Sequence, residues 1–142
     1  MENYKELVKK AIEASKNSYS PFSGFTVGAA LLTKNQKIYL GCNIENSAYS
    51  LTNCAERTAF FKAISEGEKE FQAIAIVGSD NEKFVEFCTP CGACRQVINE
   101  FCDKDFKIVL GRYNRENEIE IKVYTIGELL PEGFRFAPPV TL

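Results

Sequence analysis

The sequence contains no histidine. This absence excludes nucleophilic catalysis by a Ser-His or Cys-His pair, and it excludes every metal site that needs an imidazole ligand. A transition-metal site in this chain would have to use cysteine together with aspartate or glutamate. The 6 cysteines are therefore the main candidates for metal ligands.

An excess of basic charge and long apolar runs are also missing. The chain has 17 Lys and Arg against 19 Asp and Glu, which gives a net charge of −2 and a pI of about 5.3. A nucleic-acid-binding surface is expected to carry a basic patch, and a membrane-spanning helix needs ~20 apolar residues. We therefore expect no nucleic-acid partner and no membrane association, whereas a small neutral substrate is compatible with this composition.

The cysteines are expected to be reduced. Residues 1–6 are charged and lack the apolar stretch of a secretory signal. In a reducing compartment a Cys-x-x-Cys pair more often binds metal or performs redox work than forms a structural disulfide. These features predict a cytoplasmic protein.

Length and hydrophobic pattern predict one α/β domain over residues 1–142. Apolar residues at helical spacing predict an amphipathic helix over 3–17, and residues 25–32 and 37–42 have the pattern of a β-hairpin. The remaining expected elements are a helix at 54–66, a strand at 71–77, a loop at 79–83, an approach segment at 85–90, a helix at 92–101, strands at 106–110 and 119–124, and a helical turn at 126–130 before a proline-rich tail. Helices alternating with five strands predict a three-layer α/β/α fold around a mixed five-stranded sheet.

Two short motifs carry the chemistry: Cys-Ala-Glu at 54–56 and Pro-Cys-Gly-Ala-Cys at 90–94. A Cys-x-Glu followed by Pro-Cys-x-x-Cys is typical of zinc-dependent nucleobase deaminases. Three thiolates from Cys54, Cys91 and Cys94 would leave the fourth position of a zinc ion open for water, whose pKa the metal lowers. Glu56, next to this position, would carry protons to and from the substrate.

Other interpretations of these residues exist. The three thiols could be unrelated buried cysteines, or Cys88 could join them in a closed four-sulfur structural site without catalysis. We expect Cys88 to lie at a strand end, apart from the metal. Glu56 could instead complete a capping box with Asn53 as the N-cap, although a glutamate two residues from a metal ligand favours the catalytic role.

Two arginines follow the motifs. Zinc with three thiolates has a net negative charge, which weakens its effect on water. We expect Arg57 and Arg95 to donate hydrogen bonds to the sulfurs and so offset this charge. The alternative is that both are solvated surface residues.

Several further runs extend the pattern: residues 19–25, 27–31, 43–47, 54–59 and 90–97. In this order and spacing they resemble the small homotetrameric cytidine deaminases, from about residue 4 to 134. Cys88 departs from the family pattern, which has an ordinary residue there. The resemblance implies one Zn²⁺ per subunit, conversion of cytidine and 2′-deoxycytidine to uridine and 2′-deoxyuridine in pyrimidine salvage, and a homotetramer with pockets shared between subunits.

The same resemblance implies a substrate pocket. It assigns Asn43, Ile44 and Glu45 to the ribose, and an amide and a carboxylate suit vicinal hydroxyls. It assigns Phe25 and Phe134 to stacking on the base, with Phe134 reaching a partner's pocket, and it assigns the Ala55 carbonyl and the Cys91 backbone to the reacting groups. On the residues alone, 43–45 could be turn residues and either phenylalanine could be core. Cys42 and Cys102 are expected to pack in the core.

Three other functions stay open. A related small deaminase could act on a nucleoside antibiotic such as blasticidin S, although Asn43 and Glu45 favour an ordinary ribose. A nucleic-acid editing deaminase conflicts with the acidic pI. A structural zinc-binding interaction domain would need four sulfur ligands and would release no ammonia.

Overall fold

A mixed five-stranded sheet forms the centre of the computed structural model, which describes residues 3–81 and 83–136. The strands are β1 (Phe25–Thr33), β2 (Ile38–Cys42), β3 (Phe71–Asp80), β4 (Lys107–Tyr113) and β5 (Ile119–Thr125). Their order in the sheet is β2-β1-β3-β4-β5. β3 and β4 are parallel, whereas the other neighbouring pairs are antiparallel. The predicted five-stranded mixed sheet is confirmed.

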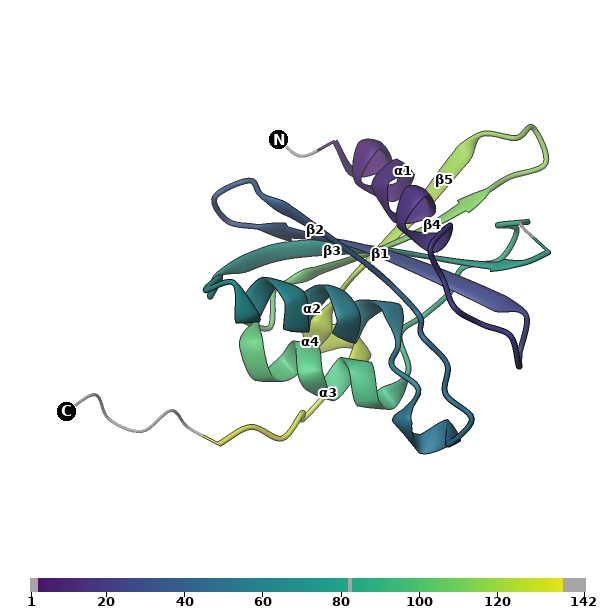
Figure 1. Cartoon of the computed structure of the whole chain (residues 1–142). Coiled ribbons are helices and arrows are strands. Elements are labelled where there is room, and N and C mark those ends of the chain that lie inside the picture. The colour runs from purple at the N-terminus through teal and green to yellow at the C-terminus, as the bar shows by residue number, and fades with distance from the viewer. Residues whose placement is uncertain (1–2, 82, 137–142) are drawn as a thin grey trace.

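Helices cover both faces of this sheet. They are α1 (Tyr4–Ser15), α2 (Ala55–Ser65), α3 (Gly92–Phe101), the short α4 (Ile126–Leu129) and a 3₁₀ turn, η1 (Tyr49–Leu51). α1 lies on one face, and α2, α3 and α4 lie on the other (Figure 1). The three-layer α/β/α arrangement predicted from the sequence is therefore also confirmed.

The central strand β3 is buried on both faces, and alternate residues serve the two cores. Ile74 and Ile76 pack with Phe60 of α2 and Ile98 of α3. Ala73, Ala75 and Val77 point the other way and pack with residues of α1. The hydrophobic run in the sequence is continuous because both faces of this strand are covered.

Two glycines allow the helices to approach the sheet closely. A Cβ at Gly28 of β1 would overlap the carbonyl oxygen of Ala11 in α1. A Cβ at Gly41 of β2 would overlap the backbone of Ala55 and Ala59 in α2. The position of α2, and with it the start of that helix, depends on this close contact.

The boundaries differ from the sequence-based expectations in a few places. α1 begins at Tyr4 and ends at Ser15, with the Asn3 side chain accepting the backbone N–H of Glu6 at 3.2 Å. β3 extends to Asp80, into the expected loop, because its last residues pair with the first residues of β1. Residues 84–90 form neither helix nor strand. The expected proline-rich tail is described as far as residue 136, without helix or strand after α4, and its last residues lie outside the described part. Among the described residues, no helix is both long and apolar enough to span a membrane.

Candidate metal centre and substrate site

The candidate ligands lie at the starts of two helices that share one face of the sheet. Cys54 is the N-cap of α2, and its carbonyl accepts the backbone N–H of Thr58 at 3.0 Å. Cys91 is the N-cap of α3, and Cys94 lies in the first turn of that helix. Helix N-termini carry partial positive charge, which stabilises thiolates placed there. The fold therefore brings three cysteines from two distant segments to two favourable helix ends.

The sulfur positions suit a zinc ion. All three Sγ atoms lie within 4.8 Å of one another, and those of Cys54 and Cys91 are 3.8 Å apart. Two sulfurs that each lie about 2.3 Å from a tetrahedral zinc ion are about 3.8 Å apart. Cys94 is buried and Cys91 is exposed, so one side of the cluster is open to solvent. This donor set fits a zinc site that retains an open position.

Cys88 is not a member of this cluster in the described part of the chain. It lies in the irregular segment 84–90 and not at a strand end as expected. A Cβ added at Gly78 would lie 2.8 Å from its Cβ, which places the side chain against the end of β3. Burial raises the pKa of the Cys88 thiol to about 12. The geometry contradicts closure by a fourth sulfur.

The three thiols do not share charge equally. Hydrogen bonds from Cys94 and Arg57 lower the pKa of Cys54 to about 5, although burial opposes this shift. The hydrogen bond to Cys54 and burial raise the pKa of the Cys94 thiol. A dication at the centre would reverse this rise, because a coordinating thiol is deprotonated outright. The cluster therefore carries its first negative charge on Cys54, next to Arg57.

The two arginines occupy different environments. Arg57 Nη2 donates to Cys54 Sγ at 3.3 Å, as expected from the sequence. Arg57 Nε is buried without a hydrogen-bond partner among the described residues. Arg95 does not contact sulfur in the described structure, contrary to the expectation: its Nε donates to the Pro90 carbonyl at 2.7 Å, and its Nη1 donates to the Leu129 carbonyl at 2.8 Å. Arg95 therefore links the backbone before α3 to the end of α4. Of the two arginines, Arg57 is the one that offsets thiolate charge directly in the described structure.

Glu56 is in the first turn of α2 and only 4% exposed. Burial raises its pKa to about 7, against the opposing effect of its own backbone N–H. The alternative capping role is wrong, because Cys54 is the N-cap and makes no side-chain capping bond. Asn53, the expected cap, donates from Nδ2 to Thr58 Oγ1 at 3.0 Å. A buried carboxyl group that does not serve as a cap is thus located two residues from a candidate ligand.

Residues 43–45 connect the metal cluster to the loop before β1. Ile44 and Asn53 exchange both backbone hydrogen bonds at 2.9 Å, immediately before Cys54. The Asn43 carbonyl accepts the Tyr19 N–H at 3.0 Å, and the Glu45 N–H donates to the Tyr19 carbonyl at 2.8 Å. The segment predicted to bind ribose is therefore fixed by backbone bonds on both sides.

The Asn43 side chain is buried and engaged within the protein. Its Oδ1 accepts the Ser18 hydroxyl at 2.5 Å and the Val27 N–H at 2.9 Å. Its Nδ2 donates to the Phe25 carbonyl at 2.8 Å. These bonds favour the structural interpretation of Asn43, because its side-chain carbonyl already has two donors.

Glu45 faces an open hollow. Its Oε1 accepts the backbone N–H groups of Phe22 and Ser23 at 2.9 and 3.1 Å, and its Oε2 accepts the Ser23 hydroxyl. The Ser23 hydroxyl is the main cause that holds the pKa of Glu45 below its usual value. Glu45, Phe22, Ser23, Tyr49 and Thr52 line a cavity of about 340 Å³. No role for Ser23 was predicted from the sequence, although Ser23 lies in one of the runs that carry the resemblance.

The other predicted substrate residues are placed as follows. Phe25 begins β1 and is 39% exposed, with its ring close to Gly78. Ala55 is fully buried, and its carbonyl oxygen lies against Gly41. Phe134 is 65% exposed, and its backbone carbonyl accepts bonds from Gln96 and Asn99 of α3. Cys102 is buried as predicted, whereas Cys42 is partly exposed.

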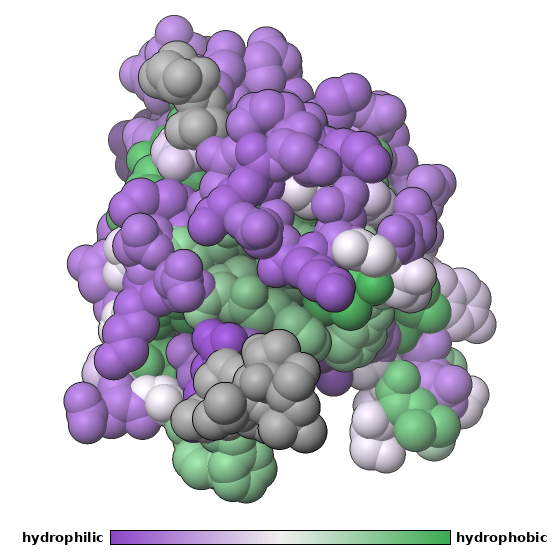
Figure 2. Space-filling model, turned by 90° about the vertical axis from the view of Figure 1, so that its left-hand side faces the viewer, coloured by the Kyte–Doolittle hydropathy of each residue, from purple (hydrophilic) through white to green (hydrophobic). Residues whose placement is uncertain are grey.

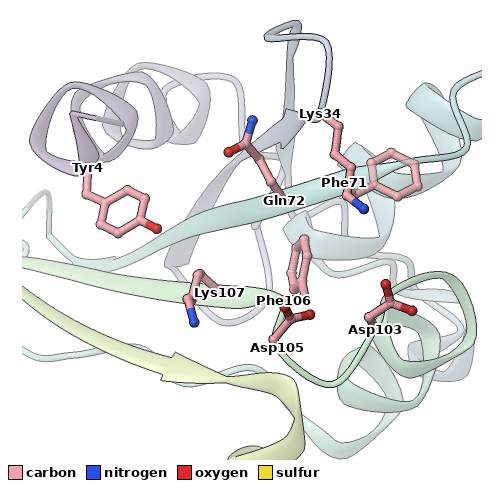
Figure 3. Close-up of a pocket in the computed structure, with 8 residues that line it drawn as sticks. All are labelled: Tyr4, Lys34, Phe71, Gln72, Asp103, Asp105, Phe106 and Lys107. Carbon is pink, nitrogen blue, oxygen red and sulfur yellow. The ribbon is translucent and has the colours of Figure 1, made fainter. Parts of the chain in front are cut away.

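A second hollow lies at the opposite end of the sheet, near the starts of β3 and β4 (Figure 3). It has a volume of about 240 Å³. Figure 3 shows Asp103 and Asp105 near Phe106, with Lys107 and Tyr4 farther along. Neither a cysteine nor any residue predicted for catalysis lines it. The chemistry therefore belongs to the end of the molecule where α2 and α3 begin.

Comparison with known proteins gives a consistent result. Residues 1–110 match the family model described as the cytidine and deoxycytidylate deaminase zinc-binding region. A cytidine deaminase from Sporosarcina psychrophila is 51% identical over 129 residues, which cover 91% of this chain and 89% of that protein.

A solved structure shows the same likeness. The crystal structure of cytidine deaminase from Burkholderia pseudomallei has a TM-score of 0.82 and 41% identity, and the match covers 94% of this chain and all of that one. A blasticidin-S deaminase from Bacillus cereus is 31% identical over 130 residues, covering 89% of this chain and 88% of that protein.

Proposed function

Because this chain belongs to the family of zinc-binding cytidine and deoxycytidylate deaminases, we propose that it hydrolyses cytidine and 2′-deoxycytidine to uridine and 2′-deoxyuridine. Water replaces the exocyclic amine at C4 of the cytosine ring, and ammonia leaves. The observation that carries this proposal is a buried Glu56 two residues from Cys54 in a cluster of three thiols that is open on one side.

Cys54, Cys91 and Cys94 are the proposed zinc ligands. A zinc ion held by them would supply Lewis acidity, which would lower the pKa of a water molecule from ~16 towards neutrality. Arg57 donates to Cys54 Sγ and so reduces the excess negative charge of three thiolates. This donation would keep a bound zinc ion electrophilic although all of its protein ligands are sulfurs.

Glu56 is the proposed proton carrier. It accepts a proton from water as the oxygen bonds to C4, and it delivers this proton to ring N3. It then moves the proton of the new C4 hydroxyl to the exocyclic nitrogen, so that the C4–N bond breaks, ammonia departs and the C4 carbonyl of uridine remains. Burial keeps bulk water away from its carboxyl group, so the proton is passed to substrate and not lost to solvent. Overall, one water is consumed and one ammonia is released for each nucleoside.

Glu45 is the proposed ribose ligand. Its carboxylate is pre-oriented by Ser23 and faces the cavity that it lines with Tyr49 and Thr52. A carboxylate accepts hydrogen bonds from sugar hydroxyls and repels a phosphate, which favours a nucleoside over a nucleotide. Asn43 supports this arrangement by bonding the backbone at Phe25 and Val27.

We also propose a homotetramer with pockets shared between subunits. Phe134 is exposed and is held against α3, so its ring is available to a neighbouring subunit's site. α2 and α3 each expose a phenylalanine, Phe61 and Phe101. Figure 2 shows an apolar area surrounded by hydrophilic residues on the side of the molecule that lies to the left in Figure 1. A cytoplasmic location agrees with 6 unpaired cysteines.

The direct test is incubation of the zinc-loaded protein with cytidine while the ultraviolet absorbance shift towards uridine and the release of ammonia are followed. Glu56→Gln is the matched control, because the amide has nearly the same shape but cannot carry the proton. The Glu56→Gln variant should keep its fold and its zinc, but its turnover should fall by at least about 10²–10⁴-fold. Full activity of a zinc-loaded Glu56→Gln protein would refute the proposed role.

A second candidate substrate is the nucleoside antibiotic blasticidin S, since the relative from Bacillus cereus bears the name of a deaminase for it. The ribose ligand proposed at Glu45 favours ordinary nucleosides. A panel of cytidine, deoxycytidine and blasticidin S, compared by kcat/KM, decides between them.

A further inference from the structure

The segment that delivers Cys91 has little backbone support. Residues 84–90 connect the end of β3 to α3 without helix or strand. Within the described residues, two main-chain carbonyls of this segment accept bonds from outside it, and they lie at its two ends. The Tyr113 N–H donates to Phe84 at 2.6 Å, and Arg95 Nε donates to Pro90 at 2.7 Å. The middle of the segment must be fixed by side chains.

Phe87 supplies that middle anchor. Its ring packs against the core on the α2 and α3 side of the sheet. The guanidinium carbon of Arg112, in β4, lies 4.3 Å from the centre of this ring, and Lys122 Nζ, in β5, lies 5.9 Å from it. A cation within about 6 Å of an aromatic face is attracted by the ring electrons. Two strands therefore hold one residue of the metal-bearing segment.

Arg112 is itself held in a fixed orientation. Its Nε donates to Glu120 Oε1 at 2.8 Å, and its Nη2 lies 2.5 Å from the same oxygen. Arg112 and Glu120 are directly opposite each other in the β4–β5 ladder, so both side chains lie on one face of the sheet. The carboxylate fixes the plane of the guanidinium, which is then presented to Phe87.

We propose that Arg112 is a positioning residue for the metal centre and that it acts through the ring of Phe87. The contact fixes the path of residues 84–90 and thereby places the Cys91 sulfur beside Cys54, while Cys88 stays turned against β3. This inference rests on the proposed zinc site, because it assigns Arg112 to the support of one zinc ligand.

The experiment measures zinc retention and needs no substrate. Transfer of zinc from the loaded protein to a colorimetric chelator is followed for Phe87→Leu, Arg112→Leu and the double variant. Each single change should speed zinc release about 10-fold, the lower end of what is typical for groups that support metal ligands. The double variant should release zinc no faster than either single one, because both changes break the same contact.

The matched control is Arg115→Leu, which removes an exposed positive charge from the same β4–β5 hairpin without touching the ring. Its zinc release should equal that of the unchanged protein. Arg112→Lys keeps a cation near Phe87 and should give an intermediate rate, which also covers the case in which Arg112→Leu folds poorly. The absorption spectrum of the Co²⁺-substituted protein should change in Phe87→Leu and stay unchanged in Arg115→Leu.

Zinc release from Arg112→Leu and Arg112→Lys at the original rate would overturn the inference, and so would strictly additive effects in the double variant. The outcome is separable from the proposed function. A protein inactive on cytidine whose Phe87 and Arg112 variants lose zinc faster supports the inference and refutes the activity. A protein that is active on cytidine, but whose Phe87 and Arg112 variants release zinc at the original rate, supports the activity and refutes the inference.

Discussion

Cys54 and Cys91 hold equivalent positions, each as the N-cap of its helix, but the chain before each is anchored differently. Asn53, which precedes Cys54, exchanges two backbone hydrogen bonds with Ile44, and α2 packs closely against Gly41 of β2. The segment before Cys91 is held by the side chains of Arg112 and Arg95. Backbone bonds tolerate most substitutions, whereas side-chain anchors do not. Mutations in the segments that precede the two ligands should therefore alter metal binding mainly on the Cys91 side, whereas Arg57 acts directly on the Cys54 sulfur.

The largest expected effect separates two thiols of the Cys91 segment. Cys91→Ala should abolish measurable deamination and reduce zinc content, because two sulfurs cannot hold the ion firmly. Cys88→Ala should retain both, since Cys88 lies outside the cluster. Zinc content per chain and initial rate with cytidine provide the measurement. Loss of zinc from Cys88→Ala would show that Cys88 is a fourth zinc ligand.

The next effect separates the arginines that follow the two motifs. Arg57→Gln should weaken zinc binding about 10–100-fold, because Arg57 donates to a ligand sulfur. Arg95→Gln should leave two carbonyls without their donor and lower the free energy of unfolding by about 1–2 kcal/mol. Chelator competition and denaturant unfolding measure the two quantities. Equal zinc affinities in the two variants would show that Arg57 supports the metal no more than Arg95 does.

A smaller effect tests the backbone-anchored side through Asn43. Asn43→Ala removes bonds to Ser18, Val27 and Phe25. The free energy of unfolding should fall by about 1–3 kcal/mol, while zinc content stays unchanged because the Ile44–Asn53 pairing is made by backbone atoms. Denaturant unfolding of the zinc-loaded protein gives the first value. A variant of normal stability with a sharply raised KM would instead identify Asn43 as a direct ribose ligand.

The smallest effect concerns pH and Ser23. The pKa of Glu45 is lowered chiefly by the Ser23 hydroxyl, so the folded protein keeps the carboxylate charged down to a lower pH than an unfolded chain does. KM for cytidine should be constant at neutral pH and rise as pH falls through the pKa of Glu45. Ser23→Ala raises that pKa, so the rise in KM should begin at a higher pH. Identical pH profiles for KM would contradict this assignment.

The sequence was informative where chemistry or periodicity is local. The Cys-x-Glu and Cys-x-x-Cys spacings indicated the metal cluster, and the apolar runs indicated all five strands. Capping was less predictable: Asn53 is the better capping residue by type, yet the chain places Cys54 at that position because Asn53 pairs with Ile44. The role of Arg95 was missed because its partner at Leu129 is distant in sequence.

Outside the metal cluster, long-range side-chain contacts were not predictable from the sequence. Nothing in the sequence near Phe87 indicates that Arg112 lies over its ring, because that contact depends on the pairing of β4 with β5 and on the path of residues 84–90. The extra length of β3 has a similar cause, since Asp80 pairs with Phe25 of β1. Local patterns identify reacting groups, whereas tertiary packing decides what supports them.

The separation of Cys54 and Cys91 by 37 residues has a consequence for the degradation of the protein in the cell. An ion bound to both sulfurs cross-links the ends of a stretch that contains α2 and the central strand. Closing such a ring lowers the entropy of the unfolded chain, and so it slows or disfavours opening of this region. Copies that have lost their metal would therefore expose α2 and β3 to proteases first, and a cell would clear inactive molecules in preference to active ones.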